Sequence, residues 1–328
     1  MTTSPPLIWA LTGRNSGDNA QALALASAVA STTGGTVREV PLRFNLWREW
    51  PWLGASLRSL KGPAPSPPWP DMVIGVGRRA VPVARWIQNQ SPTRLVWIGR
   101  PRVSPGIFDL VLTTPQYGVP DATNVMRLAL PFAEATPPSR PVAPVLVIGG
   151  HSWACRLTNE TVTQLATAVK DLGQHDLRIT TSPRTPPEIA QAIAERLPGA
   201  TFHRFGQGTN PYRQWLSEAD ACYVTGDSVS LIADAVATGA PTHIIAVPPA
   251  RLLHSLASMA PKTTQRWLVT GGNRTTLAPP PNPDAVISYL MAKGVGIKTP
   301  YGATITGARD IVSDQHAMAV KKVVSLLR

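Results

Sequence analysis

The stretch ADACYVTGDSVSLIADAVATGAPTHIIAV, residues 219–247, contains the succession of elements that decides the fold. A run of apolar residues indicates a buried strand that ends at Thr225, and an Ala-rich segment at residues 229–238 indicates a helix directly after it. Gly239 and Pro241 then end the helix ahead of a second apolar strand, THIIAV. A strand, a helix and another strand in this order predict a parallel β-α-β unit.

Strand-like and helix-like segments alternate along most of the chain, in two series. Their strands are near-continuous apolar runs, which is typical of parallel sheets covered by helices on both faces. The expected strands are residues 7–13, 36–42, 71–77, 93–99, 108–114, 124–130, 145–150, 177–183, 200–205, 221–226 and 242–247, and the expected helices are residues 18–30, 79–89, 161–172, 187–196, 229–238 and 314–327. The sequence therefore predicts an α/β fold with two facing Rossmann-like parallel-sheet domains and a cleft between them.

The domain boundaries follow from these two series. A length of 328 residues suits about two domains. We expect an N-terminal domain at residues 1–132, a proline-rich linker at residues 133–144 that is excluded from both sheets, and a C-terminal domain at residues 145–313. Residues 314–328 form a last amphipathic helix.

The composition excludes several classes of protein. With 43% hydrophobic and 15% charged residues the chain can bury a large core, so its net charge of +12 does not come from a disordered polyelectrolyte. The sequence lacks a signal-peptide pattern, a membrane-spanning apolar run, a CxxC motif and metal-ligand spacing of its six histidines. We expect a cytoplasmic protein with no metal and no cofactor. Without helix-turn-helix, RNP or zinc-finger patterns, specific binding of nucleic acid is not expected.

Polar residues cluster where three strands of the second series end. The carboxyl ends of parallel strands share one edge of a sheet, which is where ligands bind in open α/β folds. The start of the helix at residues 229–238 adds N–H groups that favour an anion there. Ordinary turn chemistry and helix capping are the alternative explanation. The candidate phosphate-binding residues are Gly149, Gly150, Thr181, Ser182, Arg184, Thr225, Gly226, Asp227, Ser228 and Ser230.

Two carboxylates are candidates for separate roles. Asp234 lies further along the helix that follows Ser228, where a carboxylate can accept hydrogen bonds from ribose hydroxyls. Asp18 lies at the start of the first helix, where it is either a dipole-stabilised carboxylate with a lowered pKa or a general base that faces the cleft. The polar loop around Asp18 also contains Gly13, Arg14, Asn15, Gly17 and Gln21.

Two further motifs suggest other enzyme classes. The run GVGRRA at residues 75–80 fits a relaxed dinucleotide-binding pattern. Arg100 and Arg102 follow about twenty residues later, where an acid would bind NAD, so an NADP site is an alternative. Residues 226–230 resemble a nucleophile elbow, but Ser230 stands where the second Gly belongs, which argues against a serine hydrolase.

An unusual insert at residues 43–70 holds four of the ten tryptophans beside four basic residues, with Glu49 as its one acid. Tryptophan next to Arg or Lys favours the interface of an anionic membrane. Packing of these rings on the domain's own core is the alternative. The four tryptophans are Trp47, Trp50, Trp52 and Trp69.

Seven blocks of the sequence resemble the mitochondrial-fission family called elongated mitochondria. They cover nearly the whole length and are WALTGRNSGDNAQ, VIGVGRRAVPVARWI, IGRPR, FDLVLTTPQYGVP, VLVIGG, ITTSPRTP and YVTGDSVSLIADAVATGAP. The family is similar in turn to GT-B glycosyltransferases, in which the segment before the ribose-binding acid has the form Ser-Gly-Ala-x-Thr-x-x-Glu. Residues 227–234 occupy the same eight-residue frame, with Asp234 in place of the usual Glu. Because Asp is one methylene shorter, one expected consequence is that donor binding is reduced or lost.

The resemblance implies a role for each candidate. Asp234 would hold the nucleotide ribose, residues 227–230 the phosphates, and Ser182 with Arg184 the pyrophosphate. Asp18 would be the base that deprotonates an acceptor hydroxyl, with its polar loop beside the acceptor. The last helix would pack back on the N-terminal domain, as in GT-B proteins.

Three functions remain as hypotheses. The first is a metal-independent GT-B-like glycosyltransferase that uses a nucleotide-diphosphate sugar and a membrane lipid or lipid-linked acceptor. The second is a non-catalytic GT-B-like scaffold that recruits partners at a membrane, as the plant members of the family do for dynamin-like proteins. The third is an NADP-dependent enzyme that modifies nucleotide sugars. Each is compatible with a cytoplasmic protein that attaches to the inner face of the cytoplasmic membrane.

Overall fold

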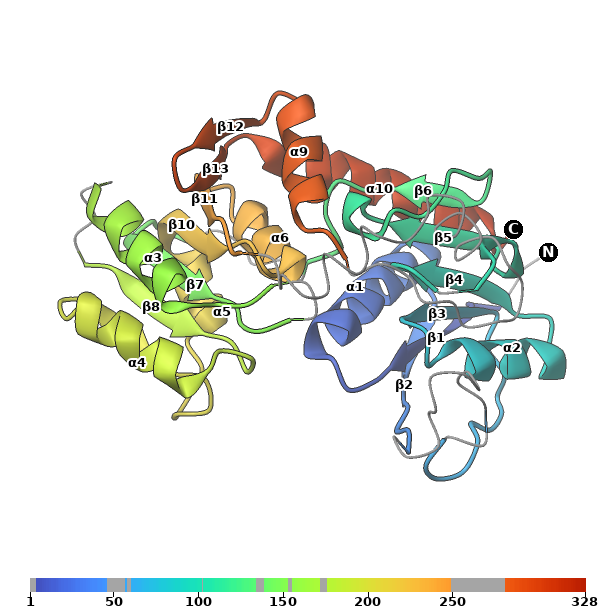
Figure 1. Cartoon of the computed structure of the whole chain (residues 1–328). Coiled ribbons are helices and arrows are strands. Elements are labelled where there is room, and N and C mark those ends of the chain that lie inside the picture. The colour runs from blue at the N-terminus through green and yellow to red at the C-terminus, as the bar shows by residue number, and fades with distance from the viewer. Residues whose placement is uncertain are drawn as a thin grey trace, which may run out of the picture. The chain divides into compact units, whose positions relative to one another are not determined.

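The computed structural model describes residues 4–45, 57, 60–101, 103–133, 139–152, 155–171, 176–248 and 281–328. Contacts within the chain divide it into two compact units (Figure 1). Unit 1 consists of Met1–Glu134, Ala260–Pro279 and Asp314–Arg328, and unit 2 consists of Ala135–Met259 and Pro280–Ser313.

The sheet of unit 1 has six parallel strands in the order β2-β1-β3-β4-β5-β6. The chain moves from β1 outward to β2 and then returns to place β3 on the other side of β1, so the strand order reverses between β1 and β3. In open α/β sheets a ligand binds at such a reversal, outside the carboxyl ends of the strands. The elements are β1 (Leu7–Thr12), α1 (Ser16–Thr33), β2 (Thr36–Pro41), β3 (Met72–Val76), α2 (Val81–Gln90), β4 (Arg94–Ile98), η3 (Pro105–Ile107), β5 (Leu110–Thr113), η4 (Pro115–Tyr117) and β6 (Val125–Arg127).

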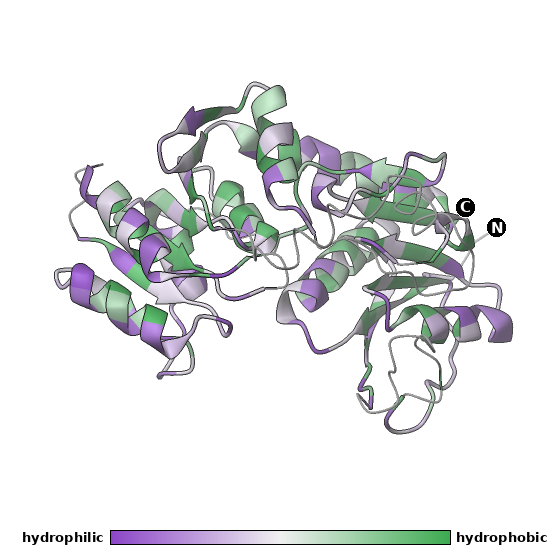
Figure 2. Ribbon diagram, viewed as in Figure 1, coloured by the Kyte–Doolittle hydropathy of each residue, from purple (hydrophilic) through white to green (hydrophobic). Residues whose placement is uncertain are grey.

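Side chains alternate between the two faces of this sheet and form two apolar clusters. In β1, Ile8 and Ala10 belong to the cluster that includes α1, whereas Trp9 and Leu11 belong to the cluster that includes α2. A period of two is what a strand buried on both faces requires. Figure 2 shows the corresponding hydrophobic strands in the interior of the unit.

Helix α10 (Ala308–Ser325) completes the core of unit 1. Ala319 and Val323 are fully buried in the cluster that contains α1. At the end of the helix, the backbone carbonyl of Leu326 accepts a hydrogen bond from Arg94 Nε at 3.0 Å. The C-terminal residues are therefore a structural part of unit 1.

Unit 2 contains a seven-stranded sheet in the order β12-β13-β11-β10-β7-β8-β9. The five strands β11, β10, β7, β8 and β9 are parallel, whereas β13 pairs antiparallel with both β11 and β12. Here the strand order reverses between β7 and β10. The elements are β7 (Ala143–Ile148), α3 (Asn159–Asp171), β8 (Arg178–Thr181), α4 (Pro187–Arg196), β9 (Thr201–His203), α5 (Tyr212–Ser217), β10 (Ala219–Thr225), α6 (Val229–Ala237), β11 (Thr242–Ile245), α9 (Asp284–Ala292), β12 (Gly296–Thr299) and β13 (Gly302–Ile305).

The α/β class with two predominantly parallel sheets is confirmed, and several boundaries are corrected. The strand expected at 124–130 keeps only the three residues of β6 in the sheet, and the last helix starts at Ala308 rather than at residue 314. The sequence analysis missed α5, α9, β12 and β13. The facing arrangement of the two domains and the cleft between them stay predictions.

The expectation that every proline of the linker is excluded from a sheet is wrong for Pro144. This residue lies in β7, between Ala143, which pairs with Ala219, and Val145, which pairs with Cys222. The register of β10 shifts between those two partners, so Pro144 faces an irregularity of the ladder, and a proline is tolerated where no ladder N–H is needed.

Only one of the four tryptophans of the insert falls among the described residues. Trp69 packs on Trp9 with ring centroids 5.8 Å apart and on Trp86 at 5.5 Å, so this ring belongs to the core of unit 1. Trp47, Trp50 and Trp52 lie outside the described residues.

Candidate functional site

The loop after β7 and the loop after β10 are joined by two hydrogen bonds in unit 2. Thr225 Oγ1 accepts the N–H of Gly149 at 2.7 Å, and Asp227 Oδ2 accepts the N–H of Gly150 at 2.9 Å. A Cβ on Gly149 would overlap the Asp227 carboxyl, and one on Gly150 would overlap the backbone of Arg184. Both glycines are therefore required by close packing of these loops at the strand-order reversal.

The loop after β8 brings Arg184 to the same place. Arg184 donates to the carbonyl of His151 at 3.2 Å and lies 3.5 Å from Asp227 Oδ2, while its side chain stays 44% exposed. Thr185 donates to the carbonyl of Gly149, and Ser182 Oγ accepts the N–H of Arg184 at 3.2 Å. These contacts hold the guanidinium in a fixed orientation while leaving part of it open to solvent.

Asp227 contacts both Gly150 and Arg184 of this cluster. Its carboxyl is fully buried, and burial raises its pKa above the ordinary value although Arg184 and the N–H of Gly150 act in the opposite direction. Among the described residues Asp227 Oδ1 has no hydrogen-bond partner. The position inside the loop junction makes Asp227 a positioning residue for Gly150 and Arg184, whereas the sequence analysis placed it among the groups that contact phosphate.

The N-terminus of α6 presents the groups that are open to a ligand. Ser228 is the N-cap residue and makes no capping hydrogen bond through its side chain, and Ser230 follows in the first turn. Both side chains are half-buried, and the first N–H groups of a helix lack partners within the helix. Hydroxyls, helix amides and Arg184 together form an arrangement suited to an anion.

Asp234 is engaged by two side chains of α5. Its Oδ2 accepts the Tyr212 hydroxyl at 2.7 Å, and its Oδ1 lies 3.4 Å from Arg213 Nη1. Burial, followed by the charge of Asp234, raises the pKa of Tyr212 well above its ordinary range. This carboxylate therefore bridges α6 and α5, a contact that the sequence analysis missed because α5 was not predicted.

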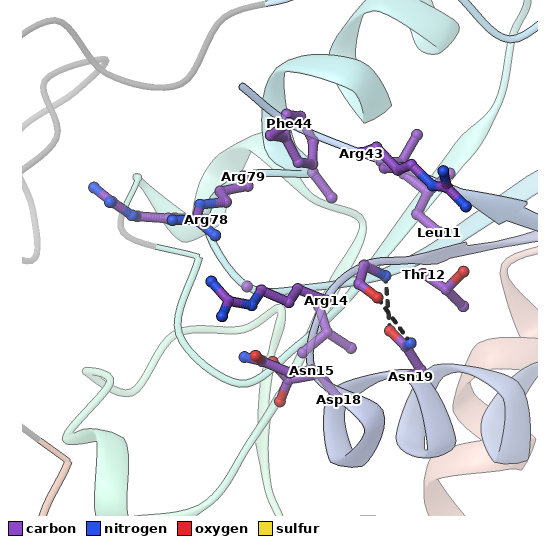
Figure 3. Close-up of a pocket in the computed structure, with 15 residues that line it drawn as sticks. Leu11, Thr12, Arg14, Asn15, Asp18, Asn19, Arg43, Phe44, Arg78 and Arg79 are labelled. Atoms are coloured by element: carbon purple, nitrogen blue, oxygen red, sulfur yellow. Dashed lines mark hydrogen bonds between the residues drawn. The ribbon is translucent and has the colours of Figure 1, made fainter. Parts of the chain in front are cut away.

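Unit 1 has a pocket of about 600 Å³ at the carboxyl ends of β1 and β3, where its strand order reverses (Figure 3). Four arginines and one carboxylate are among the residues that line it. In Figure 3, Arg14, Arg78 and Arg79 extend toward one side of the pocket and Arg43 lies across from them. The sequence analysis placed Arg14 in the acceptor loop, Arg78 and Arg79 in a dinucleotide-like motif and Arg43 in the tryptophan insert, but it did not predict that all four line one pocket.

Two side-chain contacts shape the loop after β1. Asn19 Oδ1 accepts the N–H of Gly13 at 2.7 Å, and Asn19 Nδ2 donates to the carbonyl of Gly13 at 3.0 Å. Asn15 Nδ2 donates to Asp18 Oδ2 at 3.0 Å. The loop that carries Arg14 is therefore braced at both ends.

Asp18 lines the same pocket, and partial burial raises its pKa above the ordinary value despite the hydrogen bond from Asn15. A lowered pKa, which a helix dipole alone would give, is not what the structure supports. Tyr117, in η4, is close enough for the charge of Asp18 to contribute, after burial, to raising the pKa of its hydroxyl to about 12.

Two residues of the predicted acceptor loop lie elsewhere. Gly17 is within α1, and Gln21 is a buried residue of the same helix. Gly13, Arg14, Asn15 and Asp18 line the pocket. In unit 2, Thr181 is also buried, and its hydroxyl oxygen accepts the N–H of Phe205 at 2.9 Å.

The dinucleotide-like run lies between β3 and α2, as the sequence pattern expects, but its first glycine has a packing role. A Cβ on Gly75 would lie 2.5 Å from the ring of Trp97 in the neighbouring strand. Gly77, with φ of +73°, makes the left-handed turn that leads to Arg78. Arg100 donates to the carbonyl of Tyr117 at 3.3 Å, and Arg102 lies outside the described residues.

Within the part of the chain that the structure describes, no three His, Cys, Asp or Glu side chains gather closely enough to hold a metal ion. No helix among the described residues is long and apolar enough to span a bilayer.

Comparison with known proteins identifies relatives. The family model "Mitochondrial fission ELM1" matches residues 16–269. The mitochondrial fission protein ELM1 of Arabidopsis thaliana is 30% identical over 180 residues, which are 53% of this chain and 42% of that protein. The match thus spans less than half of the length of this curated relative.

Among solved structures, MurG of Acinetobacter baumannii is 13% identical, with 98% of this chain and 99% of that chain covered and a TM-score of 0.41. UDP-GlcNAc 2-epimerase of Neisseria meningitidis, solved with bound UDP-GlcNAc, is 10% identical, with coverage of 97% and 100% and a TM-score of 0.46.

The chain thus has two α/β units, each with polar side chains at the point where the order of its parallel strands reverses. The chain belongs to the mitochondrial fission ELM1 family.

Proposed function

We propose that the chain is a GT-B-like glycosyltransferase that binds the diphosphate of a nucleotide sugar in unit 2. The observation that carries this proposal is the arrangement of Arg184 and the N-terminus of α6 around the reversal between β7 and β10. The guanidinium is held by the carbonyl of His151 and by Asp227 yet stays partly exposed, so it is preorganised for a diphosphate.

In the proposed reaction, an acceptor hydroxyl gives its proton to Asp18 while its oxygen bonds to the anomeric carbon. The bond from that carbon to the diphosphate breaks, and the nucleoside diphosphate leaves with its charge stabilised by Arg184 and the serines of α6. The raised pKa of Asp18 supports this role, because a general base works best when its pKa approaches the working pH. The acceptor would be a membrane lipid or lipid-linked molecule at the inner face of the cytoplasmic membrane.

A second candidate is the non-catalytic scaffold at a membrane. It is favoured by the engagement of both acids of the donor segment in protein contacts: Asp234 with Tyr212 and Arg213, and Asp227 with Gly150. The family name, which refers to mitochondrial fission, points in the same direction. The NADP-dependent enzyme ranks third, because Gly75 is explained by the Trp97 ring.

A panel of UDP-, GDP-, CMP- and ADP-linked sugars tests the donor site through the shift of the melting temperature. One class should stabilise the protein, and Arg184→Ala and Asp234→Ala should abolish the shift. Arg196→Ala is the matched control, since Arg196 is an exposed residue at the end of α4. No shift with any sugar contradicts the donor site. A shift without release of nucleoside diphosphate in the presence of membrane lipids favours the scaffold.

A further inference from the structure

Three of the four arginines that line the unit 1 pocket differ in their partners from several other arginines of that unit. Arg94 pairs with Asp109, Arg127 pairs with Asp121, and Arg38 stacks on Trp9. By contrast, among the described residues Arg14 and Arg78 have no side-chain hydrogen bond or ion pair. Among the same described residues, the Arg43 side chain also has no hydrogen bond or ion pair. Only the backbone carbonyl of Arg43 accepts a hydrogen bond, from the N–H of Lys61.

These three arginines follow three different strands that are neighbours in the sheet. Arg14 follows β1, Arg43 follows β2 and Arg78 follows β3, and the order β2-β1-β3 brings them to one edge. Positive charge without a counter-charge in a concave site focuses the field on a small volume. The lining contains one carboxylate, Asp18, whose Oδ2 accepts a hydrogen bond from Asn15 Nδ2 at 3.0 Å.

We propose that the unit 1 pocket is a second anion site, which binds a phosphate or diphosphate group through Arg14, Arg43 and Arg78. Guanidinium groups match phosphate oxygens in geometry and charge and bind them through paired hydrogen bonds. A volume of about 600 Å³ holds a diphosphate together with part of the group attached to it. Binding at this site does not require sugar transfer. Where the proposed function holds, the site would bind the phosphate group of the acceptor.

Calorimetric titration with inorganic pyrophosphate tests the site, on an Arg184→Ala background that removes the proposed diphosphate site of unit 2. Pyrophosphate should bind, and Arg14→Ala, Arg43→Ala and Arg78→Ala should each weaken binding about tenfold, the equivalent of about 1.4 kcal/mol. Lys321→Ala is the matched control, because Lys321 is exposed on α10 in the same unit and does not line the pocket. Absence of binding overturns the proposal, as does an equal loss in Lys321→Ala, which would show attraction to the net charge alone.

The source of the phosphate is decided by competition. Vesicles of phosphatidylcholine with phosphatidic acid should displace pyrophosphate if the natural ligand is a lipid phosphate. Binding of the protein to phosphatidylserine vesicles, where it occurs, should not change in Arg78→Ala. Displacement only by soluble phosphate esters assigns a soluble ligand to the same site. Displacement by neither overturns the assignment to phosphate esters. Failure of the sugar panel with retained pyrophosphate binding would refute the proposed function and leave this site standing.

Discussion

The carboxylate of Asp227 accepts the backbone N–H of Gly150 at 2.9 Å and so joins the end of β10 to the end of β7. These strands are neighbours at the reversal of strand order in unit 2. A buried carboxylate at this junction fixes the loop that contains His151, whose backbone carbonyl accepts a hydrogen bond from Arg184. The geometry of the proposed diphosphate site therefore depends on a residue that does not itself need to touch the ligand.

Replacement of Gly149 by Ala should destabilise unit 2. The added Cβ would overlap the Asp227 carboxyl, and overpacking of this kind costs about 1–3 kcal/mol. Urea denaturation measures the change in the free energy of unfolding. Gly199→Ala is the control, because no heavy atom lies within 4 Å of a Cβ at that position. Equal stability of the two variants would contradict the tight junction.

Asp227→Asn should change how stability depends on pH. Burial raises the pKa of Asp227 above 3.8 in the folded protein, so the folded state holds this proton more tightly than the unfolded chain. Stability is thus greatest below the ordinary pKa and falls as pH rises through the raised pKa. The asparagine variant lacks this proton, so the wild type should lose stability relative to it over that interval.

Denaturation at a series of pH values measures this difference between wild type and Asp227→Asn. Above the raised pKa the two curves should run parallel. A wild type that gains stability relative to the variant as pH rises would show that the ion pair with Arg184, at 3.5 Å, outweighs burial.

Asp18→Asn should have opposite effects on two measurements. Loss of the negative charge should tighten pyrophosphate binding in the unit 1 pocket, because Asp18 lines that pocket beside the arginines. Loss of the proposed base should slow glycosyl transfer about 10²–10⁴-fold. Calorimetry and a transfer assay on the same preparation separate the two roles. Weaker pyrophosphate binding in this variant would mean that Asp18 holds the arginines rather than opposing the anion.

Val323→Ala should destabilise unit 1 by about 2 kcal/mol, because truncation of a buried aliphatic side chain leaves a cavity in the core. Val323 is fully buried against the cluster that contains α1. Met318→Ala on the same helix is the control, since Met318 is 61% exposed. The midpoint of thermal unfolding measures both variants, and equal midpoints would contradict the assignment of this helix to the unit 1 core.

The tryptophan insert should divide into one core residue and three membrane contacts. Liposome flotation of a variant with Trp47, Trp50 and Trp52 changed to Ser should show weaker binding to anionic vesicles. Trp69→Ser should instead lower the melting temperature, because Trp69 packs on Trp9 and Trp86. Unchanged flotation of the triple variant would refute the membrane role.

Apolar periodicity predicted most of the two sheets, because strands buried on both faces are written as continuous apolar runs. It missed β12, in which Lys298 and Thr299 interrupt the run and Ile297 is 67% exposed, and with it the neighbouring four-residue strand β13. It also missed α5, since six residues are too few to show a helical period.

Sequence also predicted which strand ends carry polar residues, but not what each side chain contacts. Asp227 and Asp234 both appeared available to a ligand, yet one is bonded to Gly150 and the other to Tyr212. Those partners lie 77 and 22 residues away, so no local pattern relates them. The gathering of the pocket arginines was missed for the same reason, because the order β2-β1-β3 that brings them together is a property of the fold.

Helix α10 begins among the residues of unit 2 and ends in the core of unit 1. Because unit 1 is interrupted by the whole of unit 2, a ribosome finishes unit 2 before it makes Ala319 and Val323. At about 5–20 residues per second, roughly 10–40 s of synthesis separates Glu134 from Asp314, where the last segment of unit 1 begins. During that time the apolar side chains that these residues cover have no native partner on α10. The second unit is thus free to fold first, and the N-terminal unit closes last.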